Sequence, residues 1–501
     1  MITEKTIKIR YFALAASLLF ISHMLHAQMT REEFNKYRQE QKEEFSNYVQ
    51  EMRDEFNSFR DSINTEFAKF MRKSWEEFRA FQGIPVPQLP EPEKPPIADP
   101  EKKPTSQPLP FDKVIPLPVP TPRPEPIAPI IPQSVPETPK IPEVPTFSFL
   151  FYNTDCKVNL DNTLRFSLPD ASENNIAQTW EVLSDNKNDA LINDCLNLRD
   201  KLNLSDWGYL QMLKTLSEKF LGRESNETVL LQMFILTQSG YKVRIARSEN
   251  QLVLLVPFQE IIYEYSFINI NGIKYYVVNK NMRGQLFNIF NYEFPKEQYF
   301  SWRTEQPQLA VKLSFPKTFC SQHYPEINVS VQTNLNLIDY YNGYPQTSQW
   351  NLYALAGLSK TVKQTLYPAI QRAIADKTKI QAAGMLLDFM HTAFAYQIDD
   401  QQFGYERSFF ADENFFYPYN DCEDRSILYA LLVKDLLNLE VVLLHYPGHL
   451  ATAVHFPEDV NGDYFNLEGK KFVVCDPTYI GARIGMTMDQ FKNTNAEIIK
   501  I

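Results

Sequence analysis

Glycine, cysteine and long apolar runs are all scarce in this chain of 501 residues. The 15 glycines, beside an aromatic content of 13%, exclude a collagen-like or low-complexity chain. One apolar run, near the N-terminus, is long enough to be considered as a signal peptide or a membrane anchor. The 50 Lys and Arg residues against 61 Asp and Glu residues give a formal net charge of −11. This balance argues against nucleic acid as a partner, because phosphate-binding proteins usually need a basic face.

Cysteine is too rare for a disulfide scaffold, and its count of five is odd. At least one thiol must therefore stay unpaired within the chain. A bridge between Cys156 and Cys195 is conceivable, although spacing alone cannot fix the connectivity. The full set is Cys156, Cys195, Cys320, Cys422 and Cys475.

The N-terminal apolar run has the layout of a secretory signal peptide over residues 1–27. Lys5, Lys8 and Arg10 form a positive segment, residues 12–21 are apolar, and Ala27 offers a cleavage point. The alternative is an uncleaved anchor helix, which is disfavoured because about ten strongly apolar residues are too few to cross a bilayer. We therefore expect an exported protein that is periplasmic, associated with the cell envelope or secreted.

Residues 28–82 lack proline and glycine and repeat every eleven residues. The repeat consists of Phe34, Phe45, Phe56, Phe67 and Phe78, followed three residues later by Tyr37, Tyr48, Phe59, Phe70 and Phe81. Eleven residues make three helical turns at about 3.67 residues per turn, which keeps these aromatics on one face of a helix. A lone helix would leave that face in water, so we expect a homo-oligomeric coiled coil through residues 28–82. An amphipathic helix lying on a membrane or on another protein is the alternative.

Residues 83–147 are expected to be a linker. The stretch from Pro85 to Pro145 contains 22 of the 34 prolines. Proline has no N–H to donate to a sheet and favours polyproline II. The pattern indicates an extended spacer across the cell envelope, with a docking motif as the alternative.

From residue 148 the pattern predicts an α+β fold in two domains, at residues 148–300 and 301–501. In the first we expect helices at 206–221 and 227–236 and strands at 241–246, 252–257 and 275–278. In the second we expect helices near 353–358, 381–394 and 422–437 and strands at 440–445, 450–456 and 472–475. The dipeptide Asn461-Gly462 is typical of a hairpin turn.

Cys422, His449 and Asp476 stand 27 residues apart at the ends of expected elements. Asp421 is a fitting N-cap, which places Cys422 in the first turn of a helix, where the positive end of the dipole favours the thiolate. The two acidic residues that follow oppose this effect, so a basic neighbour would help. His449 begins one strand and Asp476 ends another, so the three side chains can meet beside one sheet as nucleophile, base and orienting group.

Three motifs resemble the transglutaminase-like superfamily, whose members have the papain-like cysteine-hydrolase fold. They are Asp421-Cys422-Glu423-Asp424-Arg425, Gly448-His449 and Asp476-Pro477-Thr478-Tyr479, within a resemblance that covers about residues 350–490. The resemblance implies that Cys422 is the nucleophile, His449 the general acid and base, and Asp476 the residue that orients the imidazole. The chain departs from the family where Leu450-Ala451 follows the histidine. The side-chain donor for the oxyanion is left open among Gln397, Tyr417 and Asn420.

Each of these residues also has an ordinary structural interpretation. Cys422 could be an inert buried thiol, His449 could be a core histidine with satisfied hydrogen bonds, and Asp476 could cap a turn. His455 lies six residues after His449, on the same strand face, and is a rival base. Cys475 should point away from Asp476 and pack in the core.

The first domain can be interpreted as a degenerate copy of the second. Asn226 would match Cys422, and Gln251-Leu252 would match His449-Leu450. Residues 275–279 echo residues 472–475. Because the three reactive side chains are missing, such a copy would serve as a scaffold or bind substrate. The alternative is an unrelated α+β domain.

Together these features predict an exported cysteine peptidase or amidase that acts on protein or peptide amide bonds, in preference to a crosslinking transglutaminase. The alternative is a non-catalytic cell-envelope binding or assembly protein that keeps the fold. No cofactor or metal is expected. Residues 459–463 favour a polar turn over a calcium site, because Tyr464 stands where an EF-hand loop needs glycine.

Overall fold

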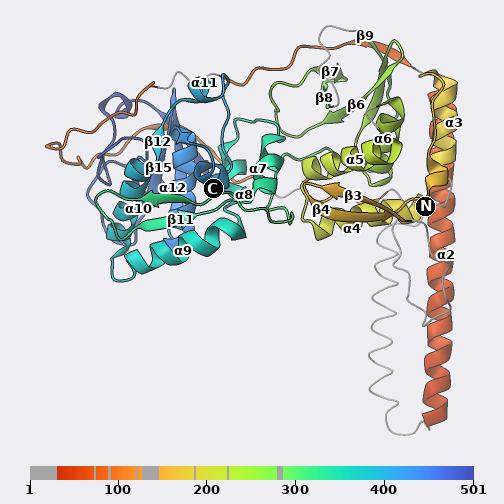
Figure 1. Cartoon of the computed structure of the whole chain (residues 1–501), viewed down its shortest axis with the longest axis horizontal. Coiled ribbons are helices and arrows are strands. Elements are labelled where there is room, and N and C mark those ends of the chain that lie inside the picture. The colour runs from red at the N-terminus through yellow and green to blue at the C-terminus, as the bar shows by residue number, and fades with distance from the viewer. Residues whose placement is uncertain are drawn as a thin grey trace. The chain divides into compact units, whose positions relative to one another are not determined.

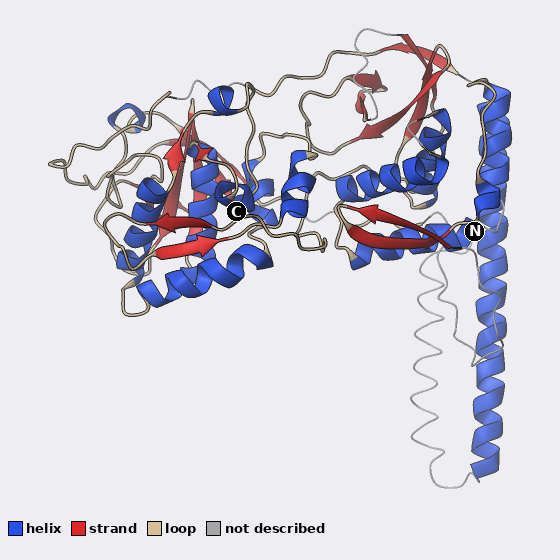
Figure 2. Ribbon diagram, in the orientation of Figure 1, coloured by secondary structure: helices blue, strands red, loops and turns tan. Residues whose placement is uncertain are grey.

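The computed structural model describes residues 31–72, 75–87, 92–119, 122–126, 146–184, 188–222, 225–278 and 286–501 (Figure 1 and Figure 2). The predicted signal peptide at residues 1–27 lies outside these ranges. The chain is mixed α+β, as expected. It divides into two units, residues 1–62 with 128–137 and residues 63–127 with 138–501. Within the described ranges, no helix is long and apolar enough to cross a membrane.

Helix α2 (Arg31–Met71) carries most of the aromatic repeat. In the part that belongs to the first unit, Phe45 and Phe59 are 56% and 51% exposed. In the part that belongs to the second unit, Phe67 is fully buried, with its ring centroid 4.4 Å from that of Trp180. The prediction of helix up to residue 82 is wrong at its end. Residues 76–79 form strand β1 (Glu76–Arg79), because the edge of a sheet supplies partners for their main-chain groups.

The first sheet has six strands in the order β1-β9-β5-β6-β8-β7. Its strands besides β1 are β5 (Arg244–Ser248), β6 (Gln251–Pro257), β7 (Phe267–Ile270), β8 (Ile273–Val277) and β9 (Leu286–Phe290). All neighbouring strands are antiparallel. Helix α6 (Asn226–Gln238) lies against β6, and from Thr228 onward all of its residues are buried.

The second sheet has six strands in the order β16-β17-β15-β14-β18-β2. They are β2 (Phe111–Ile115), β14 (Glu440–Tyr446), β15 (His449–His455), β16 (Tyr464–Leu467), β17 (Lys470–Cys475) and β18 (Ala496–Lys500). Helix α12 (Cys422–Leu437) packs on β14 and β15. The helices expected at residues 206–221 and 422–437 are confirmed at both ends, by α5 (Asp206–Leu221) and α12.

The two sheets share one strand order. Listed from the edge, β1, β9, β5, β6, β8 and β7 correspond to β2, β18, β14, β15, β17 and β16. A difference lies at the first edge, where β1 is antiparallel to β9 whereas β2 is parallel to β18. In each sheet the central hairpin follows a buried helix, α6 or α12, and the edge strand comes from residues 76–115.

The prediction of an unpacked linker at residues 83–147 is wrong for a large part of its described residues. Strand β2 fills the proline-free stretch between Pro110 and Pro116, where every residue keeps its N–H. Pro108 forms a bridge with Tyr464. Each sheet therefore includes a strand from outside the expected domain boundaries at 148–300 and 301–501.

The hairpin expected at Asn461-Gly462 is also wrong. β15 pairs with β17, and the tight turn before β17 is Glu468-Gly469, where both residues have positive φ. Gly462 is required for another reason, because a Cβ there would lie 2.3 Å from the Cα of Gly485.

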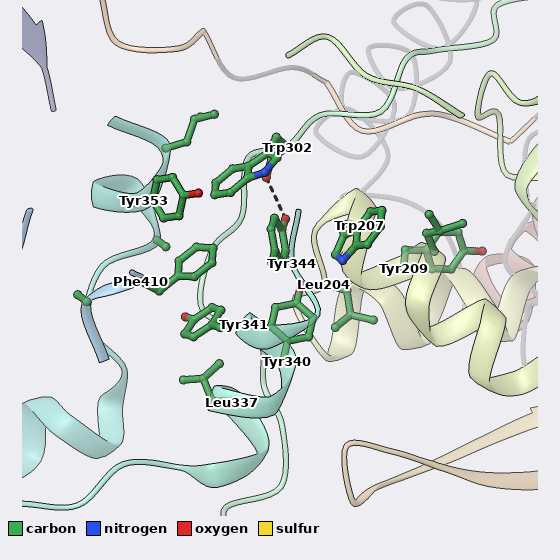
Figure 3. Close-up of a cluster of buried hydrophobic side chains, with 14 of the residues drawn as sticks. Leu204, Trp207, Tyr209, Trp302, Leu337, Tyr340, Tyr341, Tyr344, Tyr353 and Phe410 are labelled. Carbon is green, nitrogen blue, oxygen red and sulfur yellow. Dashed lines mark hydrogen bonds between the residues drawn. The ribbon is translucent and has the colours of Figure 1, made fainter. Parts of the chain in front are cut away.

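The remaining elements build the core around these sheets. They are β3 (Thr146–Phe151), β4 (Thr154–Asn159), α3 (Glu173–Leu183), α4 (Asp189–Lys201), β10 (Lys317–Cys320), β11 (Asn328–Val331), α7 (Leu335–Asn342), α8 (Trp350–Ala356), α9 (Lys360–Ile374), α10 (Lys379–Ala393), β12 (Ala395–Tyr396), α11 (Asp399–Gln402) and β13 (Tyr419–Asn420). Figure 3 shows an aromatic cluster that involves α5, α7 and α8. In it Tyr341 stacks on Phe410 with centroids 4.0 Å apart, and Tyr344 donates to the carbonyl oxygen of Trp302. Each such ring buries about 150–250 Å², so the cluster is a major part of the core.

Candidate active site

Cys422 is the first residue of α12, and Asp421 is its N-cap residue, as expected. The Cys422 side chain is fully buried. Leu450 on β15 donates its N–H to the Cys422 sulfur at 3.3 Å. The hydroxyl of Ser426, one turn along α12, donates to the carbonyl oxygen of Leu450 at 2.8 Å. These two bonds fix the start of the helix against the start of the strand, so the sulfur lies beside the residue that follows His449.

His449 and Asp476 are joined directly. The Nε2 atom of His449 lies 2.8 Å from the Oδ2 atom of Asp476. Burial alone would raise the pKa of the Asp476 carboxyl. The charge and hydrogen bond of His449, with backbone N–H bonds from Thr478 and Tyr479, outweigh burial and lower that pKa. The Asp476 carboxylate accepts a hydrogen bond from Nε2, so Nδ1 is the ring nitrogen that this contact leaves unused.

Cys422 is linked to His449 less directly than Asp476 is, through the N–H of the next residue, Leu450. Nδ1 of His449 is buried and has no hydrogen-bond partner among the described residues. Phe491 lies flat on the same imidazole, with centroids 5.4 Å apart and an interplanar angle of 4°. The structure thus brings the three predicted residues together through Leu450, without a hydrogen bond between the thiol and the imidazole. Catalytic hydrogen bonds are often long in the absence of substrate.

His391 is a functional candidate that the sequence reasoning missed. Its Nε2 lies 2.9 Å from the carbonyl oxygen of Asp476, and its Nδ1 accepts the N–H of Gly481 at 3.3 Å. The two bonds require the neutral ring with the proton on Nε2, and burial lowers the pKa of His391 accordingly. His391 is therefore a positioning residue that fixes the loop carrying Asp476. It lies in the last turn of helix α10, and no motif marks it.

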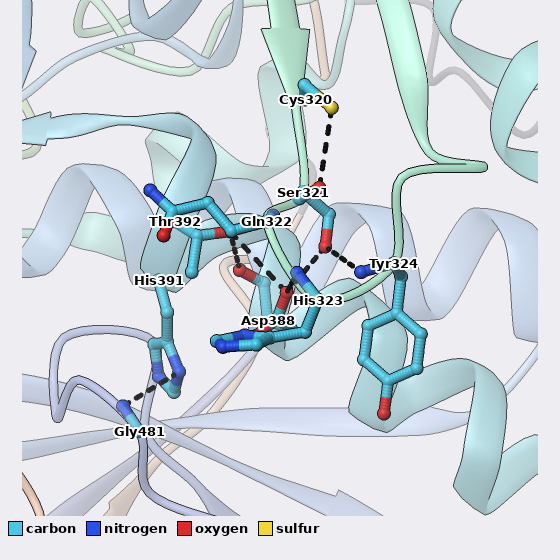
Figure 4. A network of polar contacts seen from close by, with 9 residues as sticks. All are labelled: Cys320, Ser321, Gln322, His323, Tyr324, Asp388, His391, Thr392 and Gly481. Carbon is cyan, nitrogen blue, oxygen red and sulfur yellow. Dashed lines mark hydrogen bonds and ion pairs between the residues drawn. The ribbon is translucent and has the colours of Figure 1, made fainter.

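Figure 4 shows His391 and Gly481 beside a second polar network around Asp388. There Nδ1 of His323 lies 2.7 Å from Asp388 Oδ1, and the Ser321 hydroxyl donates to Asp388 Oδ2. Because Ser321 bonds to the carboxylate and not to the imidazole, these residues do not form a serine triad.

Arg425 supplies the basic neighbour that the acidic motif requires. Its guanidinium is buried, where Nε donates to Asn420 Oδ1 at 2.9 Å and Nη2 donates to the carbonyl oxygen of Phe394 at 2.9 Å. Burial lowers the pKa of Arg425 to about 10, so the group stays charged at neutral pH. Its positive charge offsets part of the negative charge next to Cys422.

Three carboxylates next to Cys422 could hold a cation. Asp399, Asp421 and Glu423 are buried, and each offers an oxygen within 4.8 Å of the others. Calcium and magnesium prefer such oxygen ligands. Protons can neutralise the same region, since burial and neighbouring carboxylates raise the pKa of Asp399 to about 11 and that of Glu406 to about 8.

The rival residues have other partners. Nδ1 of His455 lies 3.0 Å from the carbonyl oxygen of Lys471, at the far end of β15 from Cys422. Cys475 is fully buried, and burial raises the pKa of its thiol to about 12, which fits the predicted packing role. None of the five cysteines forms a disulfide with a described residue.

The three oxyanion candidates are engaged within the fold. Asn420 donates to Asn414 at 2.8 Å, Tyr417 donates to Asn342 at 2.6 Å, and Gln397 donates to Gln401 at 3.3 Å. The geometry therefore singles out none of them.

Comparison with known proteins adds no identity. No family model, curated protein or solved structure matches this chain.

Proposed function

We propose that this chain is an exported, cysteine-dependent acyl-transfer enzyme that acts on amide bonds of proteins or peptides. Cys422 is the nucleophile, His449 the general acid and base, and Asp476 the group that orients the imidazole. The observation that carries the proposal is the hydrogen bond between His449 Nε2 and the Asp476 carboxylate. The residue after His449 on the same strand, Leu450, donates its N–H to the Cys422 sulfur. Because Nε2 pairs with Asp476, Nδ1 of His449 would be the nitrogen that exchanges a proton with the thiol.

The proposed reaction has two halves. His449 takes the thiol proton, and the thiolate forms a C–S bond with the carbonyl carbon of the amide. The C–N bond then breaks as the imidazolium gives its proton to the leaving amine, which leaves a thioester on Cys422. In the second half His449 takes a proton from water, and the resulting hydroxide forms a C–O bond with the thioester carbon. The C–S bond then breaks, the carboxylic acid leaves, and the imidazolium returns its proton to the thiolate. Backbone N–H groups at the start of α12 would stabilise the oxyanion.

Water is the preferred acceptor, which makes the enzyme a peptidase or amidase and not a crosslinking transglutaminase. The preference is based on the papain-like fold, which is a cysteine-hydrolase fold. The resemblance of the three motifs to the transglutaminase-like superfamily implies this fold. A single acceptor test separates the alternatives. A small fluorescent primary amine is incorporated into a denatured protein substrate by a transglutaminase, whereas a hydrolase releases new amino termini or ammonia.

The first sheet is proposed to be a degenerate copy of the second. The shared strand order supports this proposal, and so does a matching contact. Leu252 on β6 donates its N–H to the Asn226 side chain at 2.9 Å, as Leu450 does to Cys422. Asn279, the sequence counterpart of Asp476, lies outside the described residues. The copy would act as a scaffold or bind substrate.

The decisive experiment compares wild-type protein with Cys422→Ser and His449→Ala on denatured protein substrates. Loss of new amino termini or ammonia in both variants, with an unchanged melting temperature, is the expected result. Equal product from wild type and Cys422→Ser would reject the proposal. It would leave the alternative of a non-catalytic cell-envelope binding or assembly protein.

Self-association through α2 is a second, separable proposal. Phe45 and Phe59 are exposed on a helix whose other residues are mostly charged. A second copy of the helix would cover these rings in a coiled coil. Light scattering on the mature chain and on a chain that starts at residue 63 tests this proposal. A monomer in both cases would reject it.

A further inference from the structure

The candidate site is closed in this structure. Cys422 is 0% exposed, His449 1% and Asp476 3%. Resting on the proposed function of this same site, we propose that residues 92–109, here called the strap, form an intramolecular cover. The strap holds the site closed, and an extended peptide substrate takes the place of its first part.

The strap binds the loop that follows Asp476. The N–H of Ile480 donates to the carbonyl oxygen of Pro96 at 2.8 Å, and the N–H of Ala98 donates to the carbonyl oxygen of Ile480 at 2.8 Å. Ile97 and Ile480 thereby form a parallel bridge, as two neighbouring strands would. Ala98 is 6% exposed and packs in one apolar cluster with Phe491.

This loop is also the part that covers His449. Phe491 stacks on the imidazole of His449 on one side of the ring. Lys102 of the strap forms an ion pair with Asp489, two residues before Phe491. The strap therefore holds the segment that leads to the covering residue, by contacts with Ile480 and Asp489, which both precede Phe491 along the chain.

The strap holds the Cys422 side of the site as well. The hydroxyl of Tyr396 donates to the carbonyl oxygen of Pro92 at 3.0 Å. Tyr396 pairs with Asn420, two residues before Cys422. The guanidinium of Arg425 lies over the Tyr396 ring, 5.4 Å from its centroid. Residues 92–98 thus connect the element that leads into the nucleophile with the loop that carries the orienting carboxylate.

The two ends of the strap differ in how firmly they are held. The C-terminal end runs into β2 and is fixed by Leu109, which donates to Tyr464, and by Thr105, which donates to Asp463 at 2.6 Å. The N-terminal end contains Pro92, Pro95 and Pro96, which cannot donate main-chain hydrogen bonds. The first part of the strap can therefore leave while β2 stays in the sheet.

The mode of pairing identifies the class of substrate. The strap makes a reciprocal main-chain pair with Ile480, which any extended polypeptide can reproduce regardless of its side chains. The first part of the strap bonds to Tyr396 on the Cys422 side and to Ile480 on the Asp476 side, so a substrate that replaces it must also be extended. The substrate class is therefore an unfolded or locally extended protein segment.

Alkylation of Cys422 by iodoacetamide, followed by peptide mass mapping, measures how open the site is. Ala98→Asp puts a charge into the buried contact of the strap, and Ile97→Asp is the matched control, because Ile97 is 77% exposed. We expect Ala98→Asp to raise the rate of Cys422 alkylation at least about tenfold and Ile97→Asp to leave it unchanged. Cys195 and Cys475, both fully buried, report unfolding in the same sample and should stay unlabelled.

A surface charge reversal repeats the test without touching the core. Lys102→Glu should raise the Cys422 alkylation rate severalfold, and the double variant with Asp489→Lys should restore the wild-type rate. The proposal is overturned if neither Ala98→Asp nor Lys102→Glu raises the rate. It is equally overturned if Cys195 and Cys475 become labelled in step with Cys422 in both variants.

The same samples separate the cover from the catalysis. If the strap variants expose Cys422 but hydrolyse no denatured protein, the proposed function fails and the cover stands. If wild-type protein hydrolyses substrate as fast as the strap variants do, the cover fails and the proposed function stands.

Discussion

Asn226 is the first residue of helix α6, which packs on the first sheet. Cys422 is the first residue of helix α12, which packs on the second sheet. Each residue accepts the N–H of the second residue of the adjoining strand, Leu252 in one case and Leu450 in the other. The amide oxygen and the sulfur thus perform the same structural task. They differ in chemistry, because a carboxamide does not form a nucleophile and a thiol does.

The neighbouring positions differ in the same way. β6 begins with Gln251, where β15 begins with His449. A glutamine cannot exchange protons near neutral pH, whereas an imidazole can. The same arrangement of helix and hairpin therefore holds two different sets of side chains, and the proposed reaction would depend on those side chains and not on the arrangement.

The largest expected effect is a difference in the rate of amide hydrolysis between substitutions at the first residue of α12 and at the first residue of α6. Cys422→Ser should lower the rate of amide hydrolysis by at least about 10³-fold, because the oxygen nucleophile is poorly matched to this site. Asn226→Ala should leave the rate unchanged. Product release from a denatured protein, measured under single-turnover conditions, checks both. A similar loss in the two variants would contradict the division of roles between the sheets.

Asp476→Asn tests the orienting carboxylate, and asparagine is the residue at the corresponding position 279 of the first domain. We expect kcat to fall by about 10²–10⁴-fold with little change in KM, because the amide stabilises the wrong tautomer of His449. Steady-state kinetics measure the two constants separately. Wild-type kcat in this variant would remove Asp476 from the mechanism.

Asn226→Leu tests the structural role that Asn226 has in the first sheet. The variant leaves the N–H of Leu252 without its acceptor, so the free energy of unfolding should fall by about 1–3 kcal/mol. Denaturant titration measures the change, and Asn226→Asp, which keeps an oxygen acceptor, is the matched control. An equal loss in both variants would show that the hydrogen bond is not the cause.

The smallest expected effect is a pH dependence from His391, which has no counterpart assigned in the first sheet. Its pKa is lowered by burial, so the unfolded chain binds a proton more readily than the folded chain does. The stability contributed by neutral His391 is therefore full above its ordinary pKa of 6.5 and is lost as the pH falls below that value. His391→Gln should weaken the dependence of unfolding free energy on pH in this window. Identical pH profiles for the two proteins would contradict this assignment.

Much of the fold could be predicted from local patterns. The bounds of α5 and α12 follow from their apolar spacing and their caps, Ser205 and Asp421. The three motifs placed Cys422, His449 and Asp476 at the ends of elements that the sheet then brings together. Beyond these positions, the local pattern failed where a strand depends on a distant edge. β1 continues a helical repeat, and β2 interrupts a proline-rich segment.

The residues that surround the triad could not be predicted. His391 and Phe491 stand in no motif, and their roles depend on Gly481 and His449, which are distant in the sequence. The strap shows the same limit, because its composition indicates an extended chain in solution and says nothing of the surface that receives it.

The sequence by itself determined the bounds of α5 and α12, and it indicated Cys422, His449 and Asp476 as the candidate reactive side chains. These properties depend on residues close together along the chain. Only the tertiary structure decided that β1 and β2 complete the two sheets, that His391 bonds to the carbonyl oxygen of Asp476, and that residues 92–98 bond to Tyr396 and Ile480. Those outcomes depend on hydrogen-bond partners and apolar surfaces that exist only after distant segments have met.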